Sequence, residues 1–266
     1  MPQEKPGGYT VEPYPVLRRF SVDAGVRARH THAIHGLLEM DVTLARQVIH
    51  DHKTHTGEGL SFTGYIITCL AKAIEADRHV HAYLDWRNRL VIFDDVDVNT
   101  MIEVETESGK VVMPHIIQGA NRKSFLDIHT EIRGAQTQPS RTSEMRFMHL
   151  FLYLPGFLRR GFYGLVTRNP QRFRRYASSV LVTAVGMFGK GSGWGIPAIN
   201  FPLTVTLGGI AEKPGVVEGR IEVRQYLCVT VSFDHDIVDG APAARFTQRF
   251  RELVESGYGL DALENS

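Results

Sequence analysis

The order of the periodic segments constrains the fold of this chain more than any other feature. Segments with strand-like alternation and segments with helical spacing follow one another in mixed order, without the regular strand-helix repetition of a parallel α/β protein. We find no internal repeat. The pattern predicts an α+β fold in which a large antiparallel or mixed β-sheet is flanked by helices.

The first half of the chain contains three predicted helices and four predicted strands. The helices are expected over 43–55, 60–80 and 123–136, and the strands over 36–42, 89–93, 97–106 and 111–117. The helix over 60–80 starts with a Ser-x-x-Gly sequence and is expected to be well buried through Ile66, Ile67, Leu70, Ala73 and Ile74. Ser124 is expected to cap the helix over 123–136, which aligns Phe125, Ile128 and Ile132 on one face.

The second half is dominated by strands. Alternation predicts strands over 178–186 and on both sides of a hairpin connection at 213–219. The chain ends in an amphipathic helix after Gly240, with Ala244, Phe246, Phe250 and Leu253 expected to face the core.

Composition limits the class of partner. The 30 Lys and Arg residues nearly balance the 29 Asp and Glu residues, so the overall charge does not point to nucleic acid or to an anionic membrane, and either partner would have to be recognised locally. Cys69 and Cys228 lie in apolar segments and are expected to be buried thiols in a cytoplasmic protein. The polar, Pro-rich residues 1–16 do not resemble a signal peptide, and no apolar run of about 18 residues predicts a spanning helix.

The twelve histidines include two clusters that could suggest a metal site. These are His30, His32 and His35, and His50, His52 and His55. No carboxylate or cysteine completes a recognised zinc spacing around either cluster, so we predict no metal. The glycine-rich residues 186–195 lack the strand-glycine spacing and the trailing Lys-Ser or Lys-Thr of a phosphate-binding loop, and they are interpreted as a turn near the active site.

One histidine occupies a position suited to catalysis. The strand-like LCVTVSF ends at Phe233, and DHDIVDG then leads into the last helix, so His235 lies at a strand-to-helix corner. An imidazole with an ordinary pKa near ~6.5 can accept a proton at neutral pH. Asp239 and Gly240 are expected to hold this corner in shape. The local pattern alone also fits a histidine among solvated acids.

A family resemblance favours the catalytic interpretation. The stretch VTVSFDHDIVDGAPAARFTQRF resembles the D-H-x-x-x-D-G signature of the catalytic domain of 2-oxoacid dehydrogenase dihydrolipoyl acyltransferases, which are relatives of chloramphenicol acetyltransferase. LSFTGYIITCLAKAI, DDVDVNTMIEVETESGKVVMPHI, NRKSFLDIHTEI and VLVTAVGMFG occur in the order and spacing of that family. The resemblance covers most of residues 35–135 and 178–255.

The resemblance implies a fold, an assembly and a set of roles. The chain is expected to be a single catalytic domain over 1–266 with the chloramphenicol acetyltransferase-like fold, forming a homotrimer with active sites between subunits. In such a site His235 is the general base, and Thr183, three residues before Gly186, donates a hydrogen bond to the oxyanion. Asp239 holds the loop by pairing with an arginine near the N-terminus, for which Arg18 and Arg19 are the candidates.

Two departures from the family pattern modify these expectations. Asp236 stands where the family usually has arginine, which places a negative charge beside the base and would raise its pKa. The sequence begins almost at once with the catalytic part, so a free acyl-CoA is expected as the donor, without covalently attached lipoate. The acceptor, a thiol, hydroxyl or amine, stays open.

A third departure is the segment 137–177, which is about 25 residues longer than the family connection. It is rich in aromatic residues and arginines, and three interpretations stay open. It could form a lid or wall of the acyl or acceptor channel, contact a membrane surface through 145–166, or serve packing and oligomer contacts. Two other functions also stay open, a non-catalytic acyl-CoA-binding scaffold and a thioester hydrolase.

Overall fold

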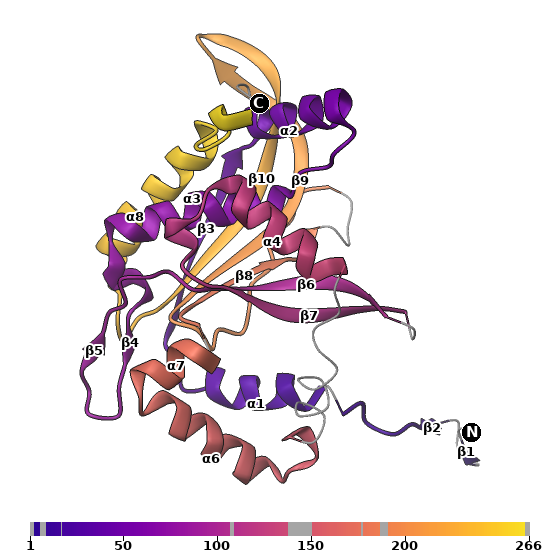
Figure 1. The fold of residues 1–266 in the computed structure, drawn as a ribbon, viewed down its shortest axis with the longest axis vertical. Helices are drawn as coiled ribbons and strands as arrows, with labels where there is room; N and C mark the ends of the chain where they lie inside the picture. The colour runs from indigo at the N-terminus through magenta and orange to yellow at the C-terminus, as the bar shows by residue number, and fades with distance from the viewer. Residues whose placement is uncertain are drawn as a thin grey trace.

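A six-stranded mixed sheet forms the centre of the molecule in the computed structural model, which describes residues 3–5, 9–16, 18–106, 109–137, 151–176, 178–186 and 191–263 (Figure 1). The sheet order is β3–β10–β9–β8–β6–β7. Its strands are β3 (Ala33–Asp41), β6 (Val98–Thr106), β7 (Gly109–Ile117), β8 (Val180–Ala184), β9 (Leu203–Val217) and β10 (Arg220–Asp234). Strand β8 runs parallel to β6 and β9, and the other pairs are antiparallel, as predicted for a mixed sheet.

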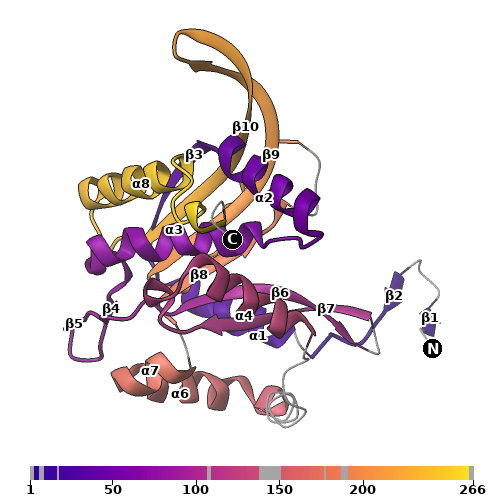
Figure 2. The ribbon, with the colours of Figure 1, turned by 45° about the horizontal axis from the view of Figure 1, so that its top comes forward.

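Helices pack on the sheet and at one end of the molecule. The helices that pack with the sheet and with one another are α2 (Thr43–Thr56), α3 (Phe62–Ala76), α4 (Phe125–Thr137) and α8 (Gly240–Glu255). A second group, α1 (Arg18–Ala28), α6 (Gly156–Thr167) and α7 (Pro170–Tyr176), lies at the lower end in Figure 2. The short elements are β1 (Gln3–Lys5), β2 (Tyr9–Val11), β4 (Tyr83–Leu84), β5 (Leu90–Val91), and the 3₁₀ turns η1 (Arg78–His81), η2 (Ala120–Arg122) and η4 (Asp261–Leu263).

Capping and periodicity explain why α3 and α4 form where the sequence predicts them. The Ser61 hydroxyl accepts a hydrogen bond from the Gly64 N–H at 3.1 Å, and the Ser124 hydroxyl accepts one from the Asp127 N–H at 3.2 Å. The apolar residues predicted to face the core from these two helices are all buried. Both cysteines are buried free thiols, and burial raises the pKa of Cys69 to about 12.

The predicted connection at 213–219 is wrong, because the hairpin between β9 and β10 turns in only two residues. Lys213 pairs with Arg224 and Val217 pairs with Arg220, so the strands continue through most of the predicted loop. Glu218 and Gly219 make the turn with φ angles of 49° and 78°. Two positive φ angles in succession match the right-handed twist of the flanking strands, which favours this tight turn.

Two further expectations need correction. In α8, Ala243, Phe246, Phe250 and Val254 are buried, whereas the predicted Ala244 is exposed, because one position rotates a side chain by about 100° around a helix. The strand predicted over 89–93 is reduced to β5, which pairs only with β4 in a separate hairpin. None of the described helices is long and apolar enough to cross a bilayer.

The described part of the segment 137–177 forms two helices that are anchored to the rest of the molecule by buried contacts. In α6, the Arg159 guanidinium donates to the Asp23 carboxylate of α1 at 2.7 Å, and both side chains are buried. In α7, Phe173 stacks on Tyr83 with ring centroids 4.2 Å apart, and Arg174 pairs with Asp97 at 3.0 Å.

Candidate active site

The corner after β10 is held by backbone hydrogen bonds to the segments beside it. The Asp234 N–H donates to the Pro202 carbonyl at 3.0 Å, and the His235 N–H donates to the His32 carbonyl at 2.7 Å. Burial raises the pKa of the Asp234 carboxyl. These contacts fix the backbone on both sides of His235, so its imidazole projects from a defined position at the end of the sheet.

His235 and Asp239 face each other across this corner. The His235 Nδ1 lies 3.7 Å from an Asp239 carboxylate oxygen, at side-chain exposures of 45% and 86%. Asp239 is the residue before α8, but its side chain makes no capping hydrogen bond to the helix. The carboxylate is therefore available to stabilise a protonated His235.

Thr183 lies near the end of β8 with a free hydroxyl. Val180 and Val182 of this strand belong to the core, and strand alternation turns Thr183 to the opposite face of the sheet. Thr183 is half-buried, and its hydroxyl forms no hydrogen bond with any described residue.

Glycines allow the backbone to close tightly behind Thr183. A Cβ on Gly186 would lie 1.8 Å from the Gly208 carbonyl oxygen, and one on Gly208 would lie 2.0 Å from the Gly193 carbonyl oxygen. The register between β9 and β10 shifts at this point, which marks a β-bulge. Only glycine fits this crossing of backbones, which explains the glycine-rich sequence after the strand.

Within one chain the structure does not bring His235 and Thr183 together. Thr183 pairs with Thr206 on β9, and Thr206 pairs with Thr230 on β10. His235 follows Thr230 by five positions, so it lies about 16 Å further along the strand direction and about 10 Å to the side. A site that uses both side chains therefore needs two copies of the chain.

The two arginines proposed as partners of Asp239 are directed elsewhere. The Arg19 guanidinium donates to the Leu152 carbonyl at 2.7 Å and lies 5.8 Å from the centre of the Tyr153 ring. Arg18 is exposed on the first turn of α1. Among the described residues, neither arginine forms an ion pair with Asp239, because α1 directs Arg19 toward the inserted segment.

Asp236 has a partner that no sequence pattern indicates. Its carboxylate lies 2.8 Å from the Nδ1 of His32, and this hydrogen bond raises the pKa of His32. Both side chains are solvent-exposed, at 77% for His32 and 47% for Asp236. The Asp236 charge is thus directed at His32, the residue whose carbonyl also holds the backbone of His235.

A pocket of about 230 Å³ opens beside the His235 corner. Its walls include Arg27 of α1, Tyr83 of β4, Asn200, and Asp234 and Asp236 of the corner itself. Tyr83 also carries the stacking contact with Phe173 of α7. The inserted segment therefore contacts one wall residue of this pocket, and of the residues that line it only His30 and Asp236 were singled out from the sequence.

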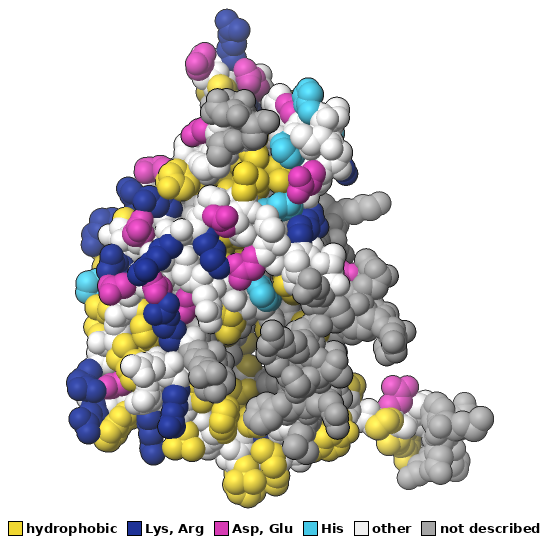
Figure 3. All heavy atoms as spheres, in the orientation of Figure 1, with side chains coloured by type: hydrophobic (Ala, Val, Ile, Leu, Met, Phe, Trp, Pro, Cys, Tyr) yellow, Lys and Arg dark blue, Asp and Glu magenta, His cyan; other side chains and the backbone are white. Residues whose placement is uncertain are grey.

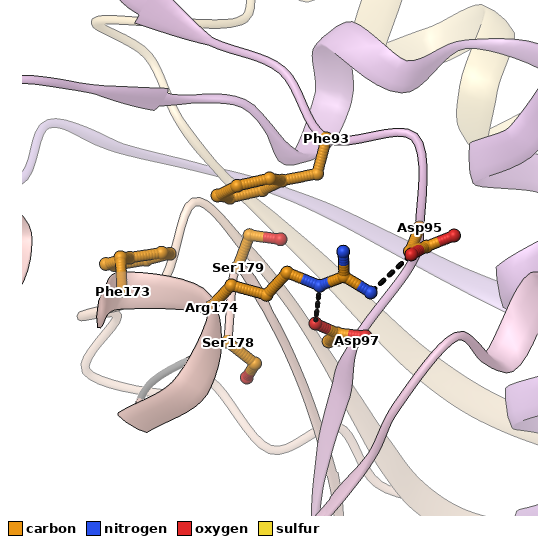
Figure 4. Close-up of a pocket in the computed structure, with 7 residues that line it drawn as sticks. All are labelled: Phe93, Asp95, Asp97, Phe173, Arg174, Ser178 and Ser179. Carbon is orange, nitrogen blue, oxygen red and sulfur yellow. Dashed lines mark hydrogen bonds and ion pairs between the residues drawn. The ribbon is translucent and has the colours of Figure 1, made fainter. Parts of the chain in front are cut away.

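A second hollow lies between α7 and the strand β6, and it is closed by protein side chains. Figure 4 shows the Arg174 guanidinium directed at Asp95 and Asp97, with the Phe93 ring above it. Arg174 pairs with both carboxylates and side chains fill the space between them. This hollow is therefore where the inserted segment packs against the rest of the molecule. In the described residues no group of three or more potential ligands could hold a metal ion.

The mixed sheet and the helices that pack on it define the fold class of the chain. The structure superposes on chloramphenicol acetyltransferase with a TM-score of 0.52 over 97% of this chain and 99% of that chain, at 16% sequence identity. The dihydrolipoamide acetyltransferase of Azotobacter vinelandii superposes with a TM-score of 0.67 over 98% and 99% of the two chains, at 17% identity. The predicted chloramphenicol acetyltransferase-like fold is confirmed.

Sequence comparison identifies the branch of this class to which the chain is related. Residues 175–260 match the family described as 2-oxoacid dehydrogenases acyltransferase (catalytic domain). The dihydrolipoyllysine-residue acetyltransferase component of the Bacillus subtilis pyruvate dehydrogenase complex is 26% identical over 245 residues, or 90% of this chain. The chain spans 48% of the length of that relative. The predicted relation to the acyltransferase catalytic domain is thereby confirmed.

Proposed function

We propose that the protein is an acyltransferase that moves an acyl group from a CoA or lipoyl thioester to a thiol, hydroxyl or amine. One spacing carries this proposal. The catalytic mechanism of the Azotobacter vinelandii enzyme has been investigated through a serine, a histidine and an asparagine, in which the serine precedes the histidine by 52 positions and the asparagine follows it by four. Thr183 precedes His235 by 52 positions, and Asp239 follows it by four.

The proposed reaction begins at the imidazole of His235. Its Nδ1 faces Asp239, which leaves Nε2 to accept the proton of the acceptor thiol, hydroxyl or amine. The acceptor atom forms a bond to the thioester carbonyl carbon, and the carbonyl oxygen becomes an oxyanion. The C–S bond then breaks, and the proton held by His235 passes to the leaving thiolate.

Thr183 is proposed to stabilise the oxyanion with its hydroxyl. A positioned donor of this kind contributes most when it has no competing partner and when its strand is rigid. Thr183 meets both conditions, since its hydroxyl has no described partner and the glycine crossing fixes the end of β8. The acyl donor, the acceptor and a homotrimer with shared sites all belong to this proposal.

Thiol release from acyl-CoA tests the proposal. Acyl-CoAs of several chain lengths are supplied with and without small thiol, hydroxyl and amine acceptors, and free CoA is measured. We expect acceptor-dependent release that falls about 10²- to 10⁴-fold in His235→Ala. Thr183→Ala should lower kcat about 10²- to 10³-fold, whereas the matched variant Thr183→Ser should keep most of the activity.

The same assay separates the rival functions. Release without added acceptor would indicate a thioester hydrolase. Binding of acyl-CoA that survives His235→Ala, with no release under any condition, would indicate a non-catalytic scaffold and refute the proposal.

A further inference from the structure

Helix α6 has a second apolar face that the rest of the protein does not cover. Arg159 and Val166 are buried on the side toward α1, at 6% and 5% exposure. The other apolar residues are directed outward, and we call them the α6 outer face. They are Leu154 at 39% exposure, Phe157 at 66%, Leu158 at 47%, Phe162 at 39% and Leu165 at 52%.

The outer face is a continuous stripe. Leu158, Phe162 and Leu165 are spaced by three, four and seven positions, which places them on one side of α6, with Phe157 beside them and Leu154 just before the first turn. Figure 3 shows hydrophobic side chains gathered at the lower end of the molecule, where Figure 1 places α6. An exposed apolar stripe of this kind marks an interaction surface.

The charge around the stripe is of one sign. Residues 151–176 contain six arginines and no aspartate or glutamate. Buried acids pair with three of them, since Arg159 and Arg160 both lie beside Asp23 and Arg174 pairs with Asp97. Arg168 and Arg172 are exposed and form no ion pair within the described part of the chain. The outer face is therefore apolar with a basic margin.

The apolar stripe and the arginines beside it narrow the kinds of partner that could cover the α6 outer face. A twofold contact with a second copy would bring the arginines of both copies against one another, because such a contact uses the same patch on each side. A contact with a different patch of another subunit is the outcome that the measurement of oligomeric state below would reveal. A helix with an apolar face and arginines beside it fits the boundary between the headgroups and acyl chains of an anionic bilayer. We propose that the α6 outer face docks the protein on an anionic lipid surface, independently of the acyltransferase function proposed above.

A second element at the same end of the molecule is suited to the same surface. The hairpin β4–β5 projects from the end that carries α6 and α7 in both ribbon views (Figures 1 and 2). Trp86 in its turn is 61% exposed, and the Arg87 guanidinium lies 4.5 Å from the centre of its ring. Tryptophan and arginine are the side chains that anchor proteins at lipid headgroups.

Vesicle co-sedimentation tests the docking. The wild-type protein is mixed with phosphatidylcholine vesicles and with vesicles that also contain phosphatidylserine. We expect binding to the anionic vesicles that weakens with added salt, and at least about tenfold weaker binding for the double variant Phe157→Ser/Leu165→Ser. Arg168→Glu/Arg172→Glu should weaken binding to anionic vesicles and leave binding to neutral vesicles unchanged.

The matched control removes exposed apolar residues elsewhere. Val216 and Ile221 form an exposed cross-strand pair near the tip of the β9–β10 hairpin, at 77% and 79% exposure. Val216→Ser/Ile221→Ser should bind anionic vesicles like wild type. Thermal unfolding of each variant, and thiol release from a soluble acyl-CoA, show whether the fold and the chemistry are intact, so failure of the docking can be told from failure of the acyltransferase.

Two results would overturn the docking. The first is a wild-type protein that stays in solution with both kinds of vesicle. The second is a Phe157→Ser/Leu165→Ser variant that binds anionic vesicles as tightly as wild type. A change of oligomeric state in this variant, measured by analytical ultracentrifugation without any vesicle binding by wild type, would assign the face to a protein contact instead.

Discussion

At the residue scale, the candidate site depends on how the corner around His235 is held. Its backbone is fixed by Pro202 and His32, and the Asp236 side chain returns to His32. His32 thus contacts the corner twice, once through its carbonyl and once through its imidazole. A charged His32 strengthens the second contact, so we expect this contact to weaken as His32 loses its proton.

The titration of His32 measures this contact. Because Asp236 stabilises the imidazolium, the pKa of His32 should lie above its ordinary value near ~6.5 in the wild type and fall toward it in Asp236→Asn. The raised pKa means that the contact favours the folded state fully below that ordinary value, and that the benefit is lost as pH rises through the raised pKa. NMR titration of the His32 ring checks this, and equal pKa values in the two proteins would show that the contact is absent in solution.

The same residues show the limit of inference from sequence at this scale. The strand that ends at Phe233 and the turn that follows it predict the position of His235, because both are local patterns. The pairing of His32 with Asp236 joins residues 204 positions apart, and no local pattern reports it. In the sequence, the histidine cluster that contains His32 could suggest metal ligands or solvated side chains. The pairing of β3 with β10 is what brings His32 close to Asp236.

At the element scale, the inserted helix α6 is attached through a charge pair that water does not reach. The Arg159 and Asp23 side chains are 7% and 3% exposed, and Arg159 also donates to the Leu154 carbonyl at 2.5 Å. Removal of one member of such a pair leaves the other charge buried without compensation, which costs far more than the pair itself contributes.

Substitutions at this pair should therefore be strongly non-additive. Arg159→Leu is expected to lower the free energy of unfolding by about 3 kcal/mol, because it removes both Arg159 hydrogen bonds to the buried Asp23 carboxylate and leaves it only the half-exposed Arg160, 3.9 Å away, among the described residues. The double variant Asp23→Leu/Arg159→Leu should recover most of that loss, since no charge is left buried. Denaturant unfolding of the four proteins completes the cycle, and additive losses would mean that the two side chains do not interact.

Periodic, capped elements could be predicted at this scale, and weakly patterned ones could not. Helices α3 and α4 combine a serine cap with an apolar stripe, so their starts and buried faces were predictable from residues 60–80 and 123–136, whereas α3 ends at Ala76, four residues before the predicted limit. Helix α1 has few apolar residues in RRFSVDAGVRA, and its position depends on Asp23 meeting Arg159. The aromatic content of the inserted segment was visible in the sequence, but the division between inward and outward faces was not.

At the scale of the whole molecule, one chain cannot assemble the proposed site. Thr183 lies at the glycine crossing beside β9, and His235 lies at the corner beyond β10, in a different part of the same sheet. The sequence resemblance predicted a site between subunits, and the separation within one chain agrees with that arrangement. The sequence could not show which surface residues lie between subunits. Helical and strand periodicities identify the residues that face the core, and exposed residues follow neither.

Complementation between two inactive variants tests the shared site most directly. His235→Ala and Thr183→Ala proteins are unfolded and refolded together, and thiol release is compared with that of each variant refolded alone. If each site takes His235 from one subunit and Thr183 from another, mixed oligomers contain some sites with both residues intact, and the account predicts activity well above either parent. Activity no greater than the average of the two parents, in oligomers shown to be mixed, would contradict it.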